Sequence, residues 1–181
     1  MGKDNKLHII LLGRRNSGKS SLINALTGQN IAIVSNVAGT TTDLVKRSYE
    51  IPDFASVIFI DTAGIRHTDD RVENMGIERT FSKIEQARVV LFLIDATKDT
   101  EQFLPYYTQV KEHLGLDARL LILLNKTDQT DSADIILSQI TSLSSGEKIL
   151  PIAAKTGYNI NHLVDELVST INLNALHSGD I

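Results

Sequence analysis

The chain has 181 residues, of which 42% are hydrophobic, and this is enough apolar material for one sizeable core and a single globular domain. The 18 basic and 22 acidic side chains give a formal net charge of −4, which disfavours direct binding of nucleic acid through its phosphate backbone. Cysteine is absent, which excludes disulfides, thiolate zinc sites and cysteine-held iron–sulfur clusters within this stretch.

Short apolar runs alternate along the chain with longer segments in which apolar residues recur at helical spacing. The short runs are typical of buried strands and lie at residues 7–12, 57–60, 89–94, 120–124 and 149–152. Helical spacing is clearest at residues 104–114, 136–143 and 160–171. This alternation predicts an α/β fold, in which βα units build a mostly parallel sheet with helices on both faces.

One pair of strand-like runs breaks the alternation. Residues 44–51 and 56–61 are separated only by Pro52-Asp53-Phe54-Ala55, which is the length of a hairpin connection. The sequence therefore predicts a six-stranded sheet with one antiparallel strand. The polar residues 173–181 are expected to fray, which leaves residues 1–172 as the folded domain.

Nothing in the sequence indicates a membrane segment. No run approaches the ~20 apolar residues that a transmembrane helix needs. The start, Met1-Gly2-Lys3-Asp4-Asn5-Lys6, carries neither an apolar signal region nor the Ser or Thr that a myristoylation signal has at its sixth position. We therefore expect a cytoplasmic protein with no membrane partner.

A phosphate-binding loop (P-loop) follows the first predicted strand directly. It reads Gly13-Arg14-Arg15-Asn16-Ser17-Gly18-Lys19-Ser20, which matches the pattern G-x-x-x-x-G-K-S/T between a strand and a helix. Gly13 and Gly18 let the backbone turn tightly, so that its N–H groups and the helix N-terminus can hold phosphate oxygens. Lys19 is expected to reach the β- and γ-phosphates, and the Ser20 hydroxyl to ligate Mg²⁺.

Two later motifs indicate which nucleotide is bound. Asp61-Thr62-Ala63-Gly64 ends a strand, where Asp61 can hold a water on the Mg²⁺ and the Gly64 N–H can touch the γ-phosphate. Asn125-Lys126-Thr127-Asp128 ends another, and the Asp128 carboxylate can accept two hydrogen bonds from guanine that adenine cannot donate. Such charge-assisted bonds are worth ~1.5–3 kcal/mol each, so GTP or GDP is the expected ligand. Lys126 is expected to lie along the base, and Asn125 to tie this loop to the P-loop.

With these motifs, the chain resembles a Ras-like P-loop G domain of the bacterial TrmE–Era–EngA group over about residues 7–172. Residues 7–10, 13–29 and 39–43 are similar to the N-terminal GTPase domain of the FeFe-hydrogenase maturase HydF, and a start at Met1 favours the same comparison. Residues 61–66 and 72–79 are instead similar to switch II of the tRNA-modification GTPase TrmE (MnmE), in which Arg is characteristic at the position of Thr42. We expect a HydF-like domain, with the TrmE type as the alternative.

The resemblance also implies how GTP is hydrolysed. Ile65 stands where Ras-like proteins place a Gln that orients the attacking water. In this group a K⁺ ion bound by the residue matching Asn16 acts where an arginine finger would. Such a finger raises the rate of hydrolysis by ~10³–10⁵-fold. Thr41 matches the threonine that ligates Mg²⁺ and contacts the γ-phosphate, with Thr40 an open alternative. Glu73 matches the glutamate that positions the water.

Taken together, the resemblance implies three groups of site residues. The catalytic group is Lys19, Thr41, Gly64 and Glu73; the nucleotide-binding group is Gly13, Asn16, Ser17, Gly18, Lys19, Ser20, Ser21, Thr41, Asn125, Lys126, Asp128, Ala154 and Lys155; the metal ligands are Ser20, Thr41 and Asp61 for Mg²⁺ and Asn16 for K⁺. Ala153 stands where relatives usually have Ser, so the following loop lacks a hydroxyl that could rigidify it. The Ala154 N–H can still contact guanine O6.

The expected function is a GTP-hydrolysing switch that forms a nucleotide-dependent homodimer through its switch segments. Hydrogenase maturation proteins are the expected partners of a HydF-like domain. A nucleotide-gated interaction module with little turnover shares the same motifs and remains an alternative. A P-loop ATPase or small-molecule kinase is disfavoured by residues 125–128.

Overall fold

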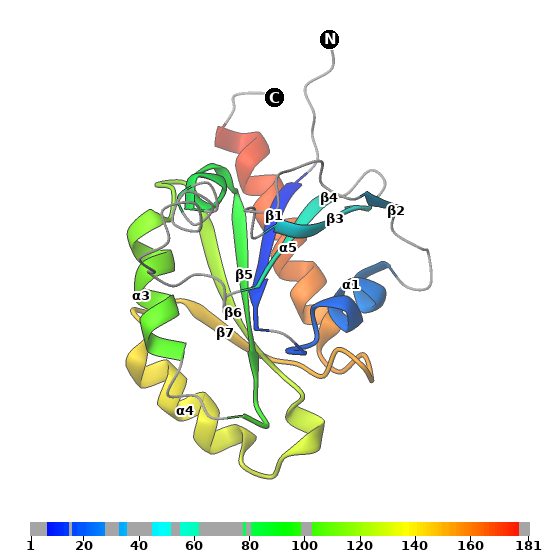
Figure 1. Cartoon of the computed structure of the whole chain (residues 1–181), viewed down its shortest axis with the longest axis vertical. Coiled ribbons are helices and arrows are strands. Elements are labelled where there is room, and N and C mark those ends of the chain that lie inside the picture. The colour runs from blue at the N-terminus through cyan, green and yellow to red at the C-terminus, as the bar shows by residue number, and fades with distance from the viewer. Residues whose placement is uncertain are drawn as a thin grey trace.

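One β-sheet runs through the middle of the computed structural model (Figure 1), which describes residues 7–14, 16–27, 33–35, 45–51, 55–61, 78, 81–98 and 103–177. The strands are β1 (Leu7–Gly13), β2 (Ile33–Ser35), β3 (Val45–Ile51), β4 (Ala55–Asp61), β5 (Val89–Asp95), β6 (Arg119–Asn125) and β7 (Lys148–Pro151). The helices are α1 (Lys19–Thr27), α3 (Phe103–His113), α4 (Ala133–Leu143) and α5 (Ile160–His177), with a 3₁₀ helix η3 (Thr127–Gln129) and a helical segment at 81–86. The last helix therefore continues past residue 172.

The sheet has seven strands in the order β2-β3-β4-β1-β5-β6-β7. β3 runs antiparallel to both of its neighbours, whereas β4, β1, β5, β6 and β7 pair in parallel. The predicted hairpin is confirmed as β3 and β4, which pair from Ile51 opposite Ala55. The predicted count of six strands is one too few. The additional strand is β2, whose three residues are too short for a periodic pattern to show.

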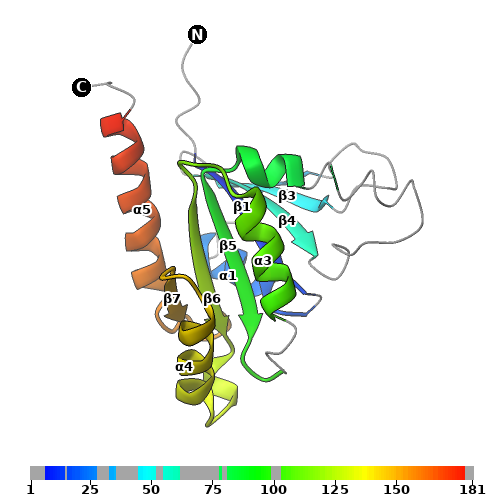
Figure 2. The same ribbon diagram turned by 90° about the vertical axis from the view of Figure 1, so that its left-hand side faces the viewer.

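Both faces of the sheet are covered, as the sequence predicts, because alternate residues of a strand point to opposite sides. Ile9 and Leu11 of β1 belong to a core cluster with residues of α1 and α5. Ile10 and Leu12 belong to a second cluster with residues of α3, α4 and the segment 81–86. Figure 2 is viewed from the side of α3 and α4, with α1 behind the sheet. Since β5 is buried on both faces, its sequence is continuously apolar from Val89 to Ile94.

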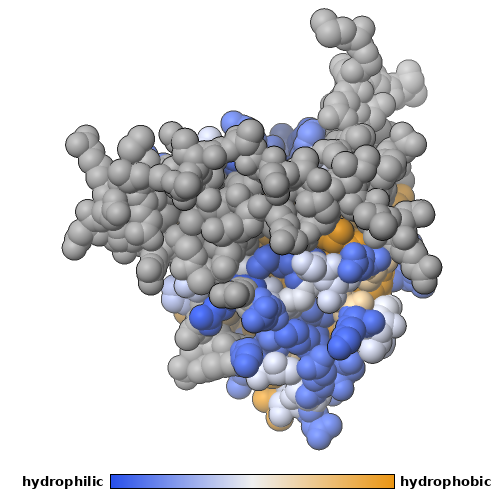
Figure 3. Space-filling view, turned by 45° about the vertical axis from the view of Figure 1, so that its right-hand side comes forward, coloured by the Kyte–Doolittle hydropathy of each residue, from blue (hydrophilic) through white to orange (hydrophobic). Residues whose placement is uncertain are grey.

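The predicted helical stripes are buried at their centres and exposed at their margins. The centres are Tyr107, Val110, Ile140, Leu163 and Leu167, which are all buried. Leu104, Leu143 and Val168 are 40%, 46% and 41% exposed, because these stripes are longer or wider than the contact with the sheet. On the face shown in Figure 3, the described surface is mostly hydrophilic with small hydrophobic areas. In the described part of the chain, no helix has the length and apolarity needed to span a bilayer.

Glu147 ties α3 to the loop that precedes β7. Its side chain is 8% exposed, and its carboxylate accepts hydrogen bonds from Tyr107 Oη at 2.7 Å, Lys111 Nζ at 2.5 Å and Ser145 N at 2.9 Å. Burial alone would raise the pKa of Glu147. The hydrogen bonds from Lys111, Tyr107 and the backbone outweigh burial, so the pKa lies below its usual range.

Glu147→Gln is expected to lower the free energy of unfolding at pH 7 by about 1–3 kcal/mol, because charge-assisted bonds are lost. The folded-state pKa lies below the unfolded one, so the carboxylate stabilises the fold above the unfolded pKa. That contribution is lost as the pH falls through the folded-state pKa. Denaturation curves of the two proteins should therefore converge in acid. Glu112→Gln on the exposed side of α3 is the control, and a Glu147→Gln deficit independent of pH would contradict the assignment.

Candidate functional site

The predicted P-loop is a tight turn between β1 and α1. β1 ends at Gly13, α1 begins at Lys19, and the turn is closed by a hydrogen bond from Ser17 N to Arg14 O at 3.1 Å. Lys19 folds back over the loop, where its Nζ donates to Gly13 O at 2.6 Å and to Arg14 O at 2.9 Å. The ammonium and the N-terminus of α1 therefore lie on the same loop, which is the arrangement that a polyphosphate requires.

Two positions in this loop require glycine. Gly18 has a φ of +106°, and a Cβ there would overlap Nδ2 of Asn125. A Cβ at Gly13 would lie 2.5 Å from Ser17 Oγ and 3.3 Å from Leu93 Cβ. The glycines thus reflect close approach by Asn125 at Gly18 and by Ser17 and Leu93 at Gly13, together with the positive φ at Gly18.

Asn125 links the P-loop to a second loop, after β7. The residue is buried at the end of β6, its Nδ2 donates to Ser17 O at 2.9 Å, and its Oδ1 accepts from Ala154 N at 3.0 Å. The tie between Asn125 and the P-loop that the sequence predicts is therefore present. The Ala154 N–H, expected at guanine O6, is engaged by Asn125 in this structure. It can reach a base only by sharing or exchanging that bond.

The side chain of Lys126 extends from the end of β6 to the P-loop. Its backbone is left-handed, with a φ of +64°, and its Nζ donates to Asn16 O at 2.7 Å and to Asp95 Oδ2 at 2.9 Å. Asp95 was not among the predicted site residues. The available signal was its place as an acidic residue at the end of a predicted strand, the same place that Asp61 occupies.

The loop after β7 is held by its backbone. Ala153 N donates to Tyr158 O at 3.2 Å, and Ala153 O accepts from the N–H groups of Thr156, Gly157 and Tyr158. The rigidity that the missing hydroxyl at Ala153 put in question is supplied by these bonds. Ala153 itself is buried, so the methyl group fills space beneath the loop.

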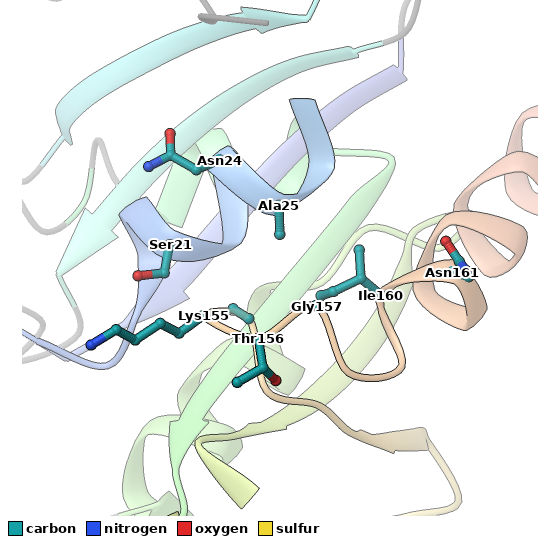
Figure 4. Close-up of a pocket in the computed structure, with 9 residues that line it drawn as sticks. Ser21, Asn24, Ala25, Lys155, Thr156, Gly157, Ile160 and Asn161 are labelled. Atoms are coloured by element: carbon teal, nitrogen blue, oxygen red, sulfur yellow. The ribbon is translucent and has the colours of Figure 1, made fainter. Parts of the chain in front are cut away.

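Ser21, Ala154 and Lys155 lie around one pocket. This pocket has a volume of about 480 Å³ and lies between α1 and the start of α5. Figure 4 shows the Lys155 side chain extending past the first turn of α1, on the side where Ser21 lies. Asp128 is exposed within η3, so its carboxylate is accessible to a base.

The residues present fit a nucleoside polyphosphate with Mg²⁺. Asp61 ends β4 and pairs with Gly13 in the sheet, which places its backbone beside the P-loop. Ser20 is exposed in the first turn of α1, and hydroxyl and carboxylate oxygens are ligands that Mg²⁺ accepts. Asn16 is exposed with a φ of +63°, so its side chain is accessible to a cation. Four predicted residues, Thr40, Thr41, Gly64 and Glu73, lie outside the described residues.

Comparison with known proteins finds GTPases among those that are similar to this chain. Residues 8–126 match the protein family described as 50S ribosome-binding GTPase. The tRNA modification GTPase MnmE of Flavobacterium johnsoniae is 38% identical over 181 residues, which cover 97% of this chain and 38% of that protein. The chain thus spans under two fifths of the length of that relative.

Solved structures have the same fold. Era in complex with MgGDPNP and nucleotides 1506–1542 of 16S ribosomal RNA has a TM-score of 0.61 and 31% identity, covering 91% of this chain and 56% of Era. The G domain of the FeoB iron transporter of T. maritima has a TM-score of 0.63 and 21% identity, covering 91% of this chain and 98% of that domain. At that identity the FeoB likeness shows the fold alone.

Proposed function

The chain belongs to the family of 50S ribosome-binding GTPases, as a G domain of the TrmE–Era–EngA type, and from that premise we propose that it binds GTP with Mg²⁺ and hydrolyses it to GDP and phosphate. The observation that carries this proposal is the buried Asn125 side chain, which joins Ser17 of the P-loop to Ala154. The phosphate loop and the loops expected around the base are thereby one hydrogen-bonded unit. A ligand with phosphates at one end and guanine at the other matches such a unit.

In this proposal the chain's own residues divide the work. Lys19 contacts the β- and γ-phosphates. Ser20, Thr41 and Asp61 hold the Mg²⁺, which neutralises phosphate charge when bound, and Thr40 is the alternative to Thr41. The Gly64 N–H contacts the γ-phosphate and Glu73 positions the attacking water. Asp128 and Lys126 select and cover the guanine.

K⁺ at Asn16 is the proposed activating cation. The Asn16 carbonyl already accepts from Lys126 Nζ, which fixes the backbone and leaves the exposed side chain amide to bind a cation. A cation there supplies positive charge for the phosphate oxygens in the transition state. Support also comes from Ile65, which stands where a water-orienting Gln would otherwise be.

GTP turnover in KCl is expected to exceed turnover in NaCl of equal ionic strength by about tenfold or more. Phosphate release from GTP measures it, with ATP as the substrate that should not be turned over. Asn16→Ala should remove the difference between the salts while leaving slow turnover in NaCl. Equal rates in the two salts would contradict the potassium proposal, and turnover of ATP equal to that of GTP would contradict the guanine-specific function.

We propose the tRNA-modification GTPase of MnmE type as the parent protein. Identity of 38% extends over nearly the whole chain, whereas the resemblance to HydF is carried by residues 7–10, 13–29 and 39–43. HydF remains the second candidate because Thr42 replaces the Arg that is characteristic of TrmE. Deletion of the gene separates the two: loss of a modified nucleoside from cellular tRNA supports the MnmE type, and loss of hydrogenase activity supports HydF.

Nucleotide-dependent homodimerisation through the segments around Thr41 and Gly64 is part of the same proposal. Size-exclusion chromatography with GDP, and with GDP plus aluminium fluoride and K⁺, tests it. A dimer only in the second condition supports a dimerising switch. Tight GTP binding with neither turnover nor dimerisation favours the nucleotide-gated interaction module.

A further inference from the structure

We propose that Asp95 is a positioning residue for the nucleotide, which holds the Lys126 ammonium in place beside the P-loop. The inference rests on the proposed guanine-nucleotide function, in which the Lys126 side chain lies along the base. Asp95 ends β5 and lies outside the three motifs expected to contact the nucleotide. Its effect on the nucleotide is therefore transmitted through Lys126.

The two oxygens of the Asp95 carboxylate have separate partners. Oδ2 accepts from Lys126 Nζ at 2.9 Å, while Oδ1 accepts from Thr97 N at 2.8 Å and from Thr97 Oγ1 at 2.6 Å. The two bonds from Thr97 fix the orientation of the carboxylate. Because its rotamer is already restricted, Asp95 loses little further conformational entropy when it pairs with Lys126.

Lys126 in turn connects three segments of the chain. Its Nζ bonds Asn16 O in the P-loop as well as Asp95 at the end of β5. β5 and β6 pair with Asp95 opposite Asn125, and Ala96 N donates to Asn125 O at 2.9 Å, which sets Asp95 beside Lys126. In the described structure, loss of the Asp95 carboxylate would leave Lys126 Nζ with its bond to Asn16 O alone.

The backbone at both ends of this contact is left-handed. Lys126 has a φ of +64° and Asn16 a φ of +63°. Asparagine tolerates this conformation, but it costs energy in lysine. Lysine has no short polar side chain to stabilise this conformation locally, so it depends on tertiary contacts. The turn at Lys126 begins η3, which carries Asp128. An ammonium held between Asp95 and Asn16 O therefore stabilises the backbone that presents Asp128.

The ion pair between Asp95 and Lys126 is partly buried. The side chains of Asp95 and Lys126 are 10% and 25% exposed, so their charge-assisted bond is stronger than that of a surface pair. Burial would raise the pKa of Asp95, but hydrogen bonds from Thr97 and Lys126 outweigh it and lower the pKa. The carboxylate is therefore ionised near neutral pH.

Release of a fluorescent GDP analogue tests the proposal in a double-mutant cycle. Asp95→Asn and Lys126→Met are each expected to speed release by roughly 10- to 100-fold. The double variant should release no faster than Lys126→Met alone, because both changes remove the same contact. For Asp95→Asn, the KM for GTP should rise while kcat changes by less than about threefold, since Asp95 does not touch the reacting atoms.

Two control variants separate the contact from general effects. Thr97→Ala removes one bond to Oδ1 and keeps the Lys126 pair, so release should change by less than about threefold. Asp117→Asn removes an 88% exposed carboxylate, 4.0 Å from Arg88 near the start of β6, and should change nothing. Thermal unfolding without nucleotide checks each fold. If Asp95→Asn does not fold, the same cycle is run with Asp95→Glu, for which the same non-additivity is expected.

The outcomes distinguish the inference from the proposed function. GDP binding by the wild type with unchanged release from Asp95→Asn overturns the role of Asp95 alone. Additive effects in the double variant also overturn it, because Asp95 would then act independently of Lys126. Absence of GDP binding by the wild type overturns the proposed function and this inference with it.

Discussion

Gly18→Ala is expected to weaken GDP binding by at least about 100-fold. A Cβ at this position would overlap Asn125 Nδ2, and a φ of +106° strains any residue with a side chain. Asn125 also bonds Ser17 O and Ala154 N, so a shift that relieves the overlap breaks the link between the two loops. Each buried group left unpaired costs about 1–3 kcal/mol. Titration with a fluorescent GDP analogue measures the loss.

Gly146→Ala is the matched control. Gly146 has a φ of +93°, but apart from Gly146 itself and its chain neighbours no heavy atom of the described residues lies within 4 Å of a Cβ built there. This variant shares the backbone strain without the overlap, so it should lower the free energy of unfolding by about 1–2 kcal/mol. Its GDP affinity should stay within about twofold of the wild type. Equal loss of affinity in both variants would show that general destabilisation of the fold, and not the Asn125 contact, is responsible.

Asp128→Asn is expected to weaken GDP binding by about 100-fold. The carboxylate offers acceptors to both N1–H and the exocyclic amine of guanine. The Asn amide keeps one acceptor oxygen. Its NH₂ group is a donor and would face the second guanine donor, so that hydrogen bond is lost. Comparison of GDP with IDP, whose base lacks the amine, isolates that contact. The wild type should prefer GDP by about tenfold or more, and the variant should lose this preference.

Asp131→Asn is the control for this change, since Asp131 is an exposed carboxylate close to η3 in the sequence. It should leave both affinities unaltered. If Asp128→Asn keeps the wild-type ratio of GDP to IDP affinity, the carboxylate does not read the amine. Guanine selection would then have to come from the backbone around Ala154.

The P-loop and the guanine motif could be located from the sequence because each is contiguous and its function follows from its spacing. The contact between Lys126 and Asp95 could not, because it depends on β5 and β6 being neighbours in the sheet. The use of the Ala154 N–H by Asn125 was missed for a similar reason, since the sequence does not show which of several acceptors lies closest. The roles of Thr41, Gly64 and Glu73 stay predictions.

The motifs alone also do not decide between a HydF-like and an MnmE-like parent protein. The expectation of a HydF-like domain rests on residues 7–10, 13–29 and 39–43, which are short segments in and near the predicted phosphate-binding motifs. The match to MnmE extends over 97% of the chain, including α3 and α4, which carry none of the predicted site residues. The proposal of an MnmE-type parent therefore rests on the extent of the match along the chain, which the motifs alone do not supply.

The two bonds of the Asn125 side chain also bear on the order in which the site forms during synthesis. Ser17 leaves the ribosome first, Asn125 follows 108 residues later, and Ala154 follows 29 residues after that. A nascent chain that ends before Asn125 lacks the hydrogen bond from Asn125 to the P-loop. A chain that ends before Ala154 lacks the N–H group that pairs with Asn125 Oδ1. Tight retention of nucleotide by ribosome-bound chains should thus begin only once the loop after β7 has emerged, so nucleotide retention marks when translation has completed the predicted binding site.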